Sequence, residues 1–345
     1  MSKQDITILE ENTLGTLLDN QPAYRVRQIF QWLWTKNITS FEEFTNLPKP
    51  LREELNDQFY LPILTIKNKQ KAKDGTIKVA FELTDKQIIE GVLIPEDKRV
   101  TACISSQVGC NVGCRFCATG KMGFSRNLSV GEIVFQVKQL NALAEETYNH
   151  HLSNIVFMGM GEPLLNYQNT MRAATILTTP EGLAMSPQRI TVSTVGIADK
   201  IVRMANESVK FNLAVSLHTA SDKVRDSLIP INKSFPLTRL QEAIKYFHTK
   251  TGNRVTLEYL LMKGINDSEK DARALTEFTK AFPCKINVIE YNPVEGLPFN
   301  RPEKDRFDQF INHLKSKNLI VMVRRSRGKD IDAACGQLAT KIKPQ

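Results

Sequence analysis

TACISSQVGCNVGCRFC, residues 101–117, holds four of the six cysteines of this 345-residue chain. Three of them, Cys110, Cys114 and Cys117, follow the spacing C-x3-C-x2-C, so three thiolates can surround one metal centre. Structural zinc sites usually have four ligands, often as two C-x2-C pairs, and no His follows here at zinc-finger spacing. A [4Fe–4S] cluster held by three cysteines leaves one iron open. The spacing therefore favours such a cluster, with a zinc knot or three unrelated cysteines as the alternatives.

Apolar strand-like runs alternate with helical stretches from about residue 100 onward. The helix-like segments include Val130–Ala144, Thr238–Thr249 and Ser268–Ala281. The strand candidates are Thr101–Ser105, Asn154–Met158, Arg189–Ser193, Phe211–Leu217, Arg254–Leu261, Lys285–Tyr291 and Leu319–Arg324. Such alternation predicts an α/β fold with parallel strands, as a barrel or a doubly wound sheet. The cysteine motif then lies on the first loop after a strand, where barrels place their chemistry.

The first 95 residues have a different character. Residues 1–60 predict a small helical domain, because apolar side chains recur at helical spacing between Tyr24 and Trp34 and form its core. Residues 61–95 predict a small linking β-sheet from three short runs, with turns at Asp74-Gly75 and Asp85-Lys86. The chain is therefore expected to divide into residues 1–60, 61–95 and 96–345.

Charge and composition restrict the class of protein. The net charge is +9, which indicates a polyanionic partner or a solvated basic surface. No segment reaches 18 apolar residues in succession and the N-terminus lacks the apolar core of a signal peptide, so we expect a cytoplasmic protein without a membrane helix. A reducing cytosol argues against a disulfide framework. The basic residues cluster at Lys67, Lys69, Lys71, Lys73, Arg324, Arg325, Arg327 and Lys329.

Two short elements support the cluster interpretation. Phe116 is an aromatic residue directly before the third cysteine, and Met160-Gly161-Glu162-Pro163 follows the next predicted strand. The second element resembles the Gly-Gly-Glu element that binds the amino group of S-adenosylmethionine in radical S-adenosylmethionine enzymes. An open iron can chelate that cofactor, and an electron from the cluster then yields a 5′-deoxyadenosyl radical.

Four segments narrow the resemblance to one family. They are residues 101–110 (TACISSQVGC), 158–166 (MGMGEPLLN), 216–218 (SLH) and 330–338 (DIDAACGQL). These segments are similar to the dual-specificity rRNA and tRNA adenine-C2 methyltransferases, and the resemblance covers nearly the whole chain. It implies a partial (β/α)6-type barrel and an N-terminal domain that contacts RNA. It also implies 23S rRNA and certain tRNAs as substrates, an electron donor such as flavodoxin or ferredoxin, and a monomer.

The resemblance also implies a role for individual residues. Cys110, Cys114 and Cys117 would hold the cluster, Cys335 would be methylated, and Cys103 would resolve the enzyme–RNA adduct. Glu90 would be the base. The residues implied to contact S-adenosylmethionine are Gly161, Glu162, Ser193, Ser216, Leu217, His218 and Asn292.

The chemistry implied by the resemblance uses two molecules of S-adenosylmethionine per turnover. Adenine C2 is electron-poor, so direct polar methylation would fail. One cofactor methylates the Cys335 thiolate by displacement, and the other supplies the radical that activates the S-methyl group. After addition to C2, Glu90 would remove the ring proton, and Cys103 would attack the Cys335 sulfur, which leaves a transient disulfide.

Several alternatives stay open at this stage. Cys103, Cys335 and His218 could be ordinary core residues, Glu90 could be a strand-edge charge, and Ser193 and Asn292 could satisfy strand ends. Cys284 has no motif around it. Pro163 and Arg327-Gly328 favour the C2 enzymes over the related adenine-C8 methyltransferase of the antibiotic-resistance type. A zinc-stabilised RNA-binding protein, or a radical enzyme with a protein or metabolite substrate, would be the other classes.

Overall fold

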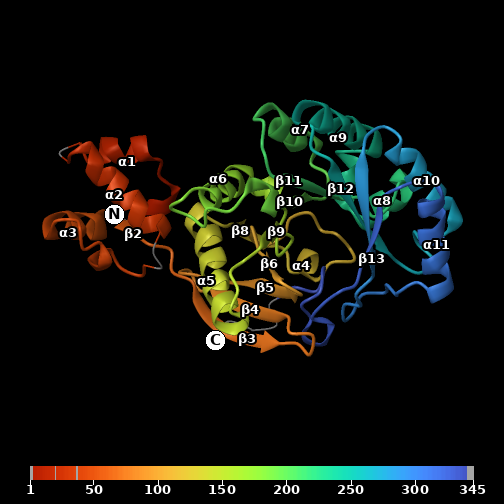
Figure 1. The fold of residues 1–345 in the computed structure, drawn as a ribbon, viewed down its shortest axis with the longest axis horizontal. Helices are drawn as coiled ribbons and strands as arrows, with labels where there is room; N and C mark the ends of the chain where they lie inside the picture. Colours follow the sequence, from red (N-terminus) through yellow and green to blue (C-terminus); the bar gives the residue numbers. More distant parts are fainter. Residues whose placement is uncertain (1–2, 20, 36–37, 340–345) are drawn as a thin grey trace.

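The computed structural model describes residues 3–19, 21–35 and 38–339. Residues 340–345, the end of the predicted barrel region, lie outside these described residues. The main element is a ten-stranded sheet in the order β14-β13-β12-β11-β10-β9-β6-β5-β4-β3 (Figure 1). Because β14 and β3 stand at its two ends, the sheet is an open, partial barrel. The predicted α/β class is confirmed.

Seven strands of this sheet run parallel, from β6 to β14. Each lies within two residues of a predicted strand at either end. Their carboxyl ends meet at one edge, where the following loops gather. The strands are β6 (Arg99–Cys103), β9 (Asn154–Phe157), β10 (Ile190–Thr194), β11 (Asn212–Ser216), β12 (Val255–Leu261), β13 (Cys284–Glu290) and β14 (Val321–Arg324).

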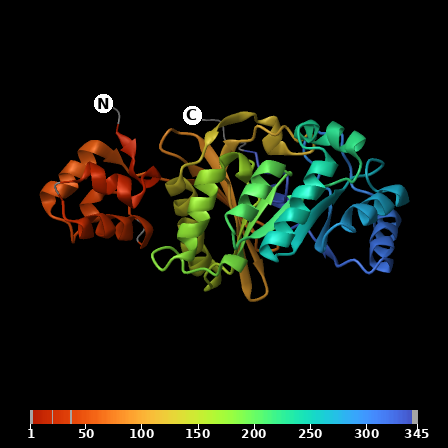
Figure 2. The same cartoon turned by 90° about the horizontal axis from the view of Figure 1, so that it is seen from above.

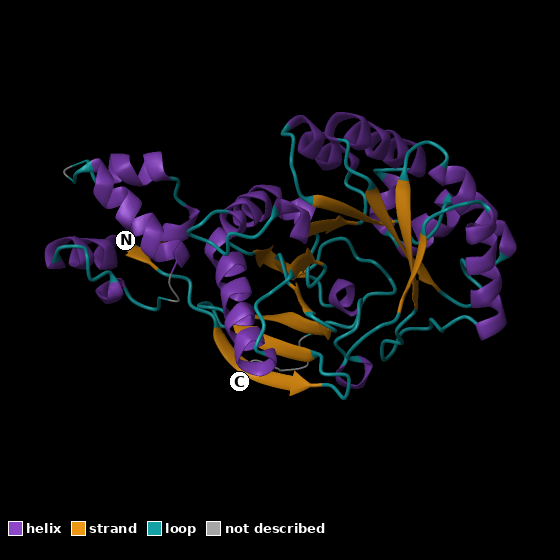
Figure 3. Cartoon of the chain, in the orientation of Figure 1, coloured by secondary structure: helices purple, strands orange, loops and turns teal. Residues whose placement is uncertain are grey.

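Helices cover the outside of the parallel strands, while the short α4 (Ala118–Lys121) lies inside the curve of the sheet (Figures 1 and 3). Serine N-caps in capping boxes start α5 and α10, and Gly252 ends α9 in a left-handed conformation. The outer helices are α5 (Val130–Tyr148), α6 (Tyr167–Thr178), α7 (Ala198–Asn206), α8 (Asp222–Leu228), α9 (Leu237–Thr251), α10 (Glu269–Thr279) and α11 (Lys304–Ser316). In the described part of the chain, no helix has the length and apolar character needed to cross a membrane.

Three antiparallel strands extend the barrel sheet on one side. They are β3 (Thr65–Lys71), β4 (Ile77–Glu82) and β5 (Ile88–Glu96), and β5 pairs with β6. The predicted linking strands therefore continue the barrel sheet instead of standing apart from it. A separate two-stranded sheet, β7 (Gln107–Gly109) with β8 (Phe124–Asn127), flanks the cysteine loop.

The N-terminal helices form a module beside the barrel (Figure 2). Its elements are α1 (Glu11–Leu17), α2 (Ala23–Thr35), α3 (Lys49–Gln58) and the strand pair β1 (Gln4–Asp5) and β2 (Phe59–Tyr60). Trp32 stacks on Phe44 within the module, with ring centroids 5.5 Å apart. Trp34 instead contacts Phe135 of α5, with centroids 6.3 Å apart. One aromatic residue therefore joins the module to the barrel.

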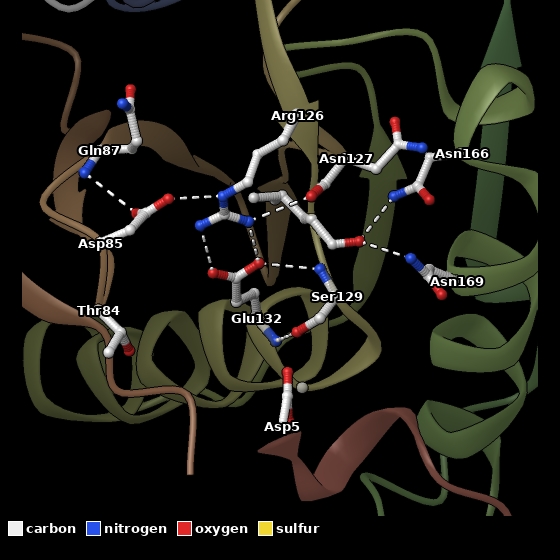
Figure 4. A network of polar contacts seen from close by, with 12 residues as sticks. Asp5, Thr84, Asp85, Gln87, Arg126, Asn127, Ser129, Glu132, Asn166 and Asn169 are labelled. Carbon is white, nitrogen blue, oxygen red and sulfur yellow. Dashed lines mark hydrogen bonds and ion pairs between the residues drawn. The ribbon is translucent and has the colours of Figure 1, made fainter. Parts of the chain in front are cut away.

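A polar network fixes the linking strands to the barrel (Figure 4). Arg126 of β8 donates to Asp85 in the β4–β5 turn at 2.6 Å, and to both oxygens of Glu132 in α5 at 2.8 Å. Glu132 also accepts the backbone N–H of Ser129 at 2.8 Å. The Glu132 side chain is almost fully buried, so the guanidinium compensates a buried charge that would otherwise be costly.

Candidate active site

The carboxyl ends of the parallel strands surround a cavity of about 210 Å³. Of the predicted site residues, all but Glu90, Leu217 and Asn292 line it. The predicted residues in its wall are Cys103, Cys110, Cys114, Cys117, Gly161, Glu162, Ser193, Ser216, His218 and Cys335. Residues separated by more than two hundred positions thus share one chamber.

The cysteine motif forms a buried loop between β7 and α4. Gly113 turns the loop in a left-handed conformation (φ 70°), and the N–H of Cys117 donates to the carbonyl of Cys114 at 3.2 Å. The N–H of Arg115 donates to the carbonyl of Leu228 at 2.9 Å, which ties the loop to the end of α8. Burial raises the pKa of Cys110 to about 12 and raises that of Cys114 well above its ordinary value. Such thiols ionise when a metal centre stabilises their thiolates.

Gly161 and Glu162 press against the strand that leads into the cysteine loop. Gly161 has φ +99°, and a Cβ atom there would lie 2.6 Å from the Cβ of Gln107. The Glu162 N–H donates to Oε1 of Gln107 at 2.8 Å. The Glu162 carboxylate accepts the N–H groups of Leu164 at 3.0 Å and Val195 at 2.8 Å. Burial raises its pKa to about 7, so the cavity holds a carboxylate poised to bind a cation.

The ends of β10 and β11 bring Ser193 and Ser216 to the wall. His218 follows with a left-handed backbone (φ 59°), and its Nδ1 accepts the N–H of Leu260 at 3.1 Å. Burial lowers its pKa to about 3, so the ring is neutral. It meets the Phe116 ring edge-on, with centroids 5.0 Å apart. Leu217 is fully buried and does not line the cavity.

The loop that carries Cys335 is anchored beside the cysteine motif. The N–H of Ala118 donates to the carbonyl of Gly336 at 2.8 Å, and Oγ1 of Thr119 donates to the carbonyl of Leu338 at 2.6 Å. Nδ2 of Asn292 donates to the carbonyl of Cys335 at 3.4 Å. The buried Oδ1 of Asn292 has no hydrogen-bond partner among the described residues. An orphaned buried acceptor of this kind indicates a missing ligand.

Cys103, at the end of β6, faces the same cavity as Cys335. Burial raises the pKa of Cys103 to about 12, and a charge on Cys335 raises it further. Burial also raises the pKa of Cys335 to about 11, although this residue is the more exposed of the two. Both thiols therefore lie in the wall of one cavity.

Glu90 lies outside the cavity wall and is almost fully buried. It shares a face of β5 with Ile94, which does line the cavity, because side chains alternate along a strand. Its N–H donates to Sδ of Met160 at 3.3 Å, and Ser105 Oγ donates to its carbonyl at 2.6 Å. Burial raises the pKa of the Glu90 carboxyl, and the Lys78 ammonium opposes this shift.

Comparison with known proteins places this geometry in a family. Residues 104–275 match the Radical SAM superfamily, and residues 17–61 match the ribosomal RNA large subunit methyltransferase N-terminal domain. The chain is 46% identical over 343 residues to the probable dual-specificity RNA methyltransferase RlmN of Flavobacterium psychrophilum, with 99% of both chains covered. The chain belongs to the RlmN family. The RlmN relative from Cytophaga hutchinsonii is 50% identical, with 93% of this chain and 88% of the relative covered.

A solved structure agrees with this membership of the RlmN family. The crystal structure of a radical SAM methyltransferase from Sphaerobacter thermophilus superposes with a TM-score of 0.89 at 43% identity. The match covers 97% of this chain and 98% of the other. The similarity therefore includes both the N-terminal module and the barrel.

As a radical SAM enzyme of the RlmN family, the chain uses a [4Fe–4S] cluster and S-adenosylmethionine. The cavity fits both groups, since it presents three thiols, the right donors for a cluster with one open iron. Among the described residues, no three His, Cys, Asp or Glu side chains converge on one point that would hold a single ion. Glu162 and the orphaned Oδ1 of Asn292 offer acceptors for the cofactor's polar groups.

Two residues of this RlmN family site, Arg225 and Glu258, were missed in the sequence. Arg225 is fully buried and donates to the carbonyls of Leu217 at 3.1 Å, Ser216 at 3.3 Å and Val195, so it joins the ends of β10 and β11. Glu258 and Arg324 line the cavity and lie 3.8 Å apart. A carboxylate inside the apolar run of β12 was a usable signal for Glu258. Arg225 had none, because an arginine in a short helix looks solvent-exposed.

Proposed function

We propose that this chain methylates C2 of a specific adenine in 23S rRNA and of the adenine beside the anticodon in a subset of tRNAs. One observation supports the proposal most strongly. Cys103 and Cys335 line the same cavity as the three cysteines of the C-x3-C-x2-C motif. A radical enzyme that acts directly on its substrate needs only the three motif cysteines, whereas a methyl group relayed through sulfur needs two more thiols.

Residues in or beside the cavity wall would hold the cofactors next to these thiols. Cys110, Cys114 and Cys117 would hold the cluster, which supplies the electron that converts S-adenosylmethionine to methionine and a 5′-deoxyadenosyl radical. Glu162 would accept a hydrogen bond from the cofactor's amino group, and Oδ1 of Asn292 would accept one from a second polar group. The other proposed contacts are Gly161, Ser193, Ser216, Leu217 and His218.

Cys335 would carry the methyl group. A sulfur lone pair of its thiolate would displace S-adenosylhomocysteine from the methyl carbon of one cofactor molecule, and the S-methyl group would then lose a hydrogen atom to the 5′-deoxyadenosyl radical from the second, which becomes 5′-deoxyadenosine. Once this carbon has added to C2, the adduct would return one electron to the cluster that supplied it, and the ring would lose its C2 proton, whose bonding pair stays in the ring. Glu90 would take that proton. The Cys103 thiolate would then attack Sγ of Cys335, so that an S–S bond forms and the S–C bond breaks. The released carbon takes a proton, and an external reductant restores both thiols.

The cavity mouth suits an RNA substrate. Arg324, Arg325 and Arg327 line it, and every residue of β3, including Lys67, Lys69 and Lys71, is exposed. These cations would bind phosphates, which position an RNA without reading its sequence. The target adenine must leave its stack to reach the cavity. The N-terminal module would add RNA contacts, and we further propose a monomer in the cytoplasm that receives electrons from a flavodoxin or ferredoxin.

Mass spectrometry of nucleosides tests the proposal. Reconstituted protein, reductant and S-adenosylmethionine are incubated with unmodified 23S rRNA or tRNA fragments. We expect 2-methyladenosine. Formation of 8-methyladenosine would instead indicate the C8 reaction. Absence of any methylated adenosine from a sample that cleaves S-adenosylmethionine would contradict the RNA assignment and indicate another substrate class.

A further inference from the structure

Lys78 is a buried lysine on the inner face of the sheet. It is the second residue of β4 and is only 9% exposed. Lys78 pairs with Val92 of β5, which pairs with Cys103 of β6. Paired residues share a face of the sheet, so Lys78 lies in the same cross-strand row as the proposed resolving cysteine. Lysine is rarely buried without a partner that compensates its charge.

Two contacts compensate the charge of Lys78, and they lead to different parts of the site. Its Nζ lies 3.7 Å from Oε1 of Glu90. The same Nζ donates to the carbonyl of Asp332 at 3.4 Å. Asp332 precedes Cys335 by three residues and has a left-handed backbone with φ 52°. One ammonium group therefore joins the proposed base to the loop that carries the proposed methyl carrier.

Lys78 contacts only one of the two carboxylate oxygens of Glu90. Its Oε1 faces Lys78, whereas its buried Oε2 has no hydrogen-bond partner among the described residues. The charged groups that influence Glu90 are Lys78 of β4 and Asp332 of the C-terminal loop, and their effects oppose each other. The Lys78 ammonium and the backbone N–H of Ala339 both favour the ionised carboxylate, against the burial that raises its pKa.

The Cys335 loop is held to the same hairpin by two further contacts. The N–H of Gly328 donates to Oδ2 of Asp74 at 2.9 Å, and the N–H of Lys73 donates to Oδ2 of Asp330 at 3.0 Å. Both lie in or next to the β3–β4 turn. The loop therefore spans from β14, at one end of the sheet, to the β3–β4 hairpin at the other. Lys78 is the residue of this hairpin that contacts both the Cys335 loop and Glu90.

We propose that Lys78 is a positioning residue for methyl transfer, which holds Glu90 and the Cys335 loop together so that the base and the methyl carrier meet the same adenine. The inference rests on the proposed function, because it assumes Glu90 to be the base. Lys78 lies outside the cavity wall, so it would act through Glu90 and the Cys335 loop. Its effect is to keep Glu90 able to accept the C2 proton and to fix the distance between that carboxylate and the loop.

The test compares Lys78→Met with Lys78→Arg, which keeps the charge. Lys138→Met is the matched control, since Lys138 is also buried and lies on α5, outside the cavity wall. We expect Lys78→Met to slow 2-methyladenosine formation by about 10²-fold or more at neutral pH, the usual scale of a general base. The acidic limb of its pH–rate profile should move to higher pH, because loss of the cation raises the pKa of Glu90. Lys78→Arg should restore most of the rate, and Lys138→Met should match the wild type.

The covalent enzyme–RNA adduct provides a second readout. In Lys78→Met the adduct should accumulate on a denaturing gel, as it should in Cys103→Ala, because the ring proton leaves slowly. Cleavage of S-adenosylmethionine should change by less than about twofold, since the cofactor contacts lie elsewhere. If Lys78 had only a structural role, its replacement would lower 2-methyladenosine formation and S-adenosylmethionine cleavage by the same factor and would leave the pH–rate profile unchanged.

Glu90→Gln keeps the test decisive if Lys78→Met folds poorly. The double variant Glu90→Gln/Lys78→Met should fold, because the buried carboxylate that needed a charged partner is no longer present. Its rate of 2-methyladenosine formation should be less than about twofold below that of Glu90→Gln alone. An unchanged pH profile in Lys78→Met, or additive rate losses in the double variant, would overturn the inference while wild-type methylation stands. Failure of the wild type to methylate RNA would instead overturn the proposed function.

Discussion

Replacing Gly161 with alanine tests how tightly the cofactor loop and the cysteine loop are packed. The new Cβ would lie 2.6 Å from Cβ, 2.7 Å from Cγ and 2.8 Å from the backbone nitrogen of Gln107. Gln107 cannot easily retreat, because its side chain accepts the N–H of Glu162 at 2.8 Å and donates to Asn127 at 2.7 Å. Any relaxation must therefore move Glu162 away from β7.

The expected loss in the free energy of unfolding of Gly161→Ala has two parts. A left-handed backbone costs a residue with a side chain about 1–2 kcal/mol. Overpacking against a fixed neighbour adds about 1–3 kcal/mol. The sum is about 2–5 kcal/mol, which for a chain of this size lowers the Tm by about 3–7 °C. Because the same shift displaces Glu162, the affinity for S-adenosylmethionine should fall by at least about tenfold.

Thermal unfolding of the cluster-free protein, followed by circular dichroism, measures the first effect. Gly252→Ala is the matched control, since Gly252 also has a positive φ (+69°) but no atom lies within 4 Å of its added Cβ. The Tm of the control should fall only by the backbone contribution, about 1–3 °C. Equal Tm values for the two variants, or unchanged cofactor affinity in Gly161→Ala, would refute the close-packing argument.

Three further outcomes are expected. Cys335→Ala should retain about four irons per chain but form no methyladenosine, and normal methylation by this variant would exclude the relay through sulfur. Arg126→Met should lower the free energy of unfolding by roughly 2–3 kcal/mol in urea titrations, because it leaves the buried Glu132 without its guanidinium partner, and a neutral result would contradict the role given to this network. The pKa of Glu162 is raised by burial from 4.5 to about 7, so the folded state holds a proton that the unfolded state releases. The contribution of this proton to stability is complete below the unfolded pKa and is lost as the pH rises through about 7. The free energy of unfolding of the cluster-free wild type, relative to Glu162→Gln, should therefore fall by roughly 2–3 kcal/mol between about pH 5 and about pH 8. A difference that does not change with pH would disprove the pKa shift.

The parallel strands and the three motif cysteines could be predicted because their signals are local. Runs of apolar residues such as ITVST at 190–194 and VTLEYLL at 255–261 indicate strands directly, and the motif spans only eight positions. Cys335 and Cys103 carry no local signal strong enough to separate them from core residues. A resemblance to a family was needed for both, and the fold brings them into the same cavity.

Other features depend on register and could not be predicted. Lys78 alternates with Ile77 and Val79, a pattern typical of a strand with one solvent-facing side. In the structure β4 is buried on both faces, because the sheet curves and the Cys335 loop covers its inner side. The burial of Arg225 likewise results from contacts with carbonyls of two neighbouring strands, which no spacing in the sequence reveals.

The central claim is that Cys110, Cys114 and Cys117 hold a cluster with one iron free for S-adenosylmethionine. Quantifying methionine and 5′-deoxyadenosine after reconstitution with iron, sulfide and a reductant tests it most directly. We expect the two products in equal amounts from the wild type and none from a variant in which all three cysteines are alanine. Equal product formation by that variant, or none by a wild-type sample that has bound about four irons, would contradict the account.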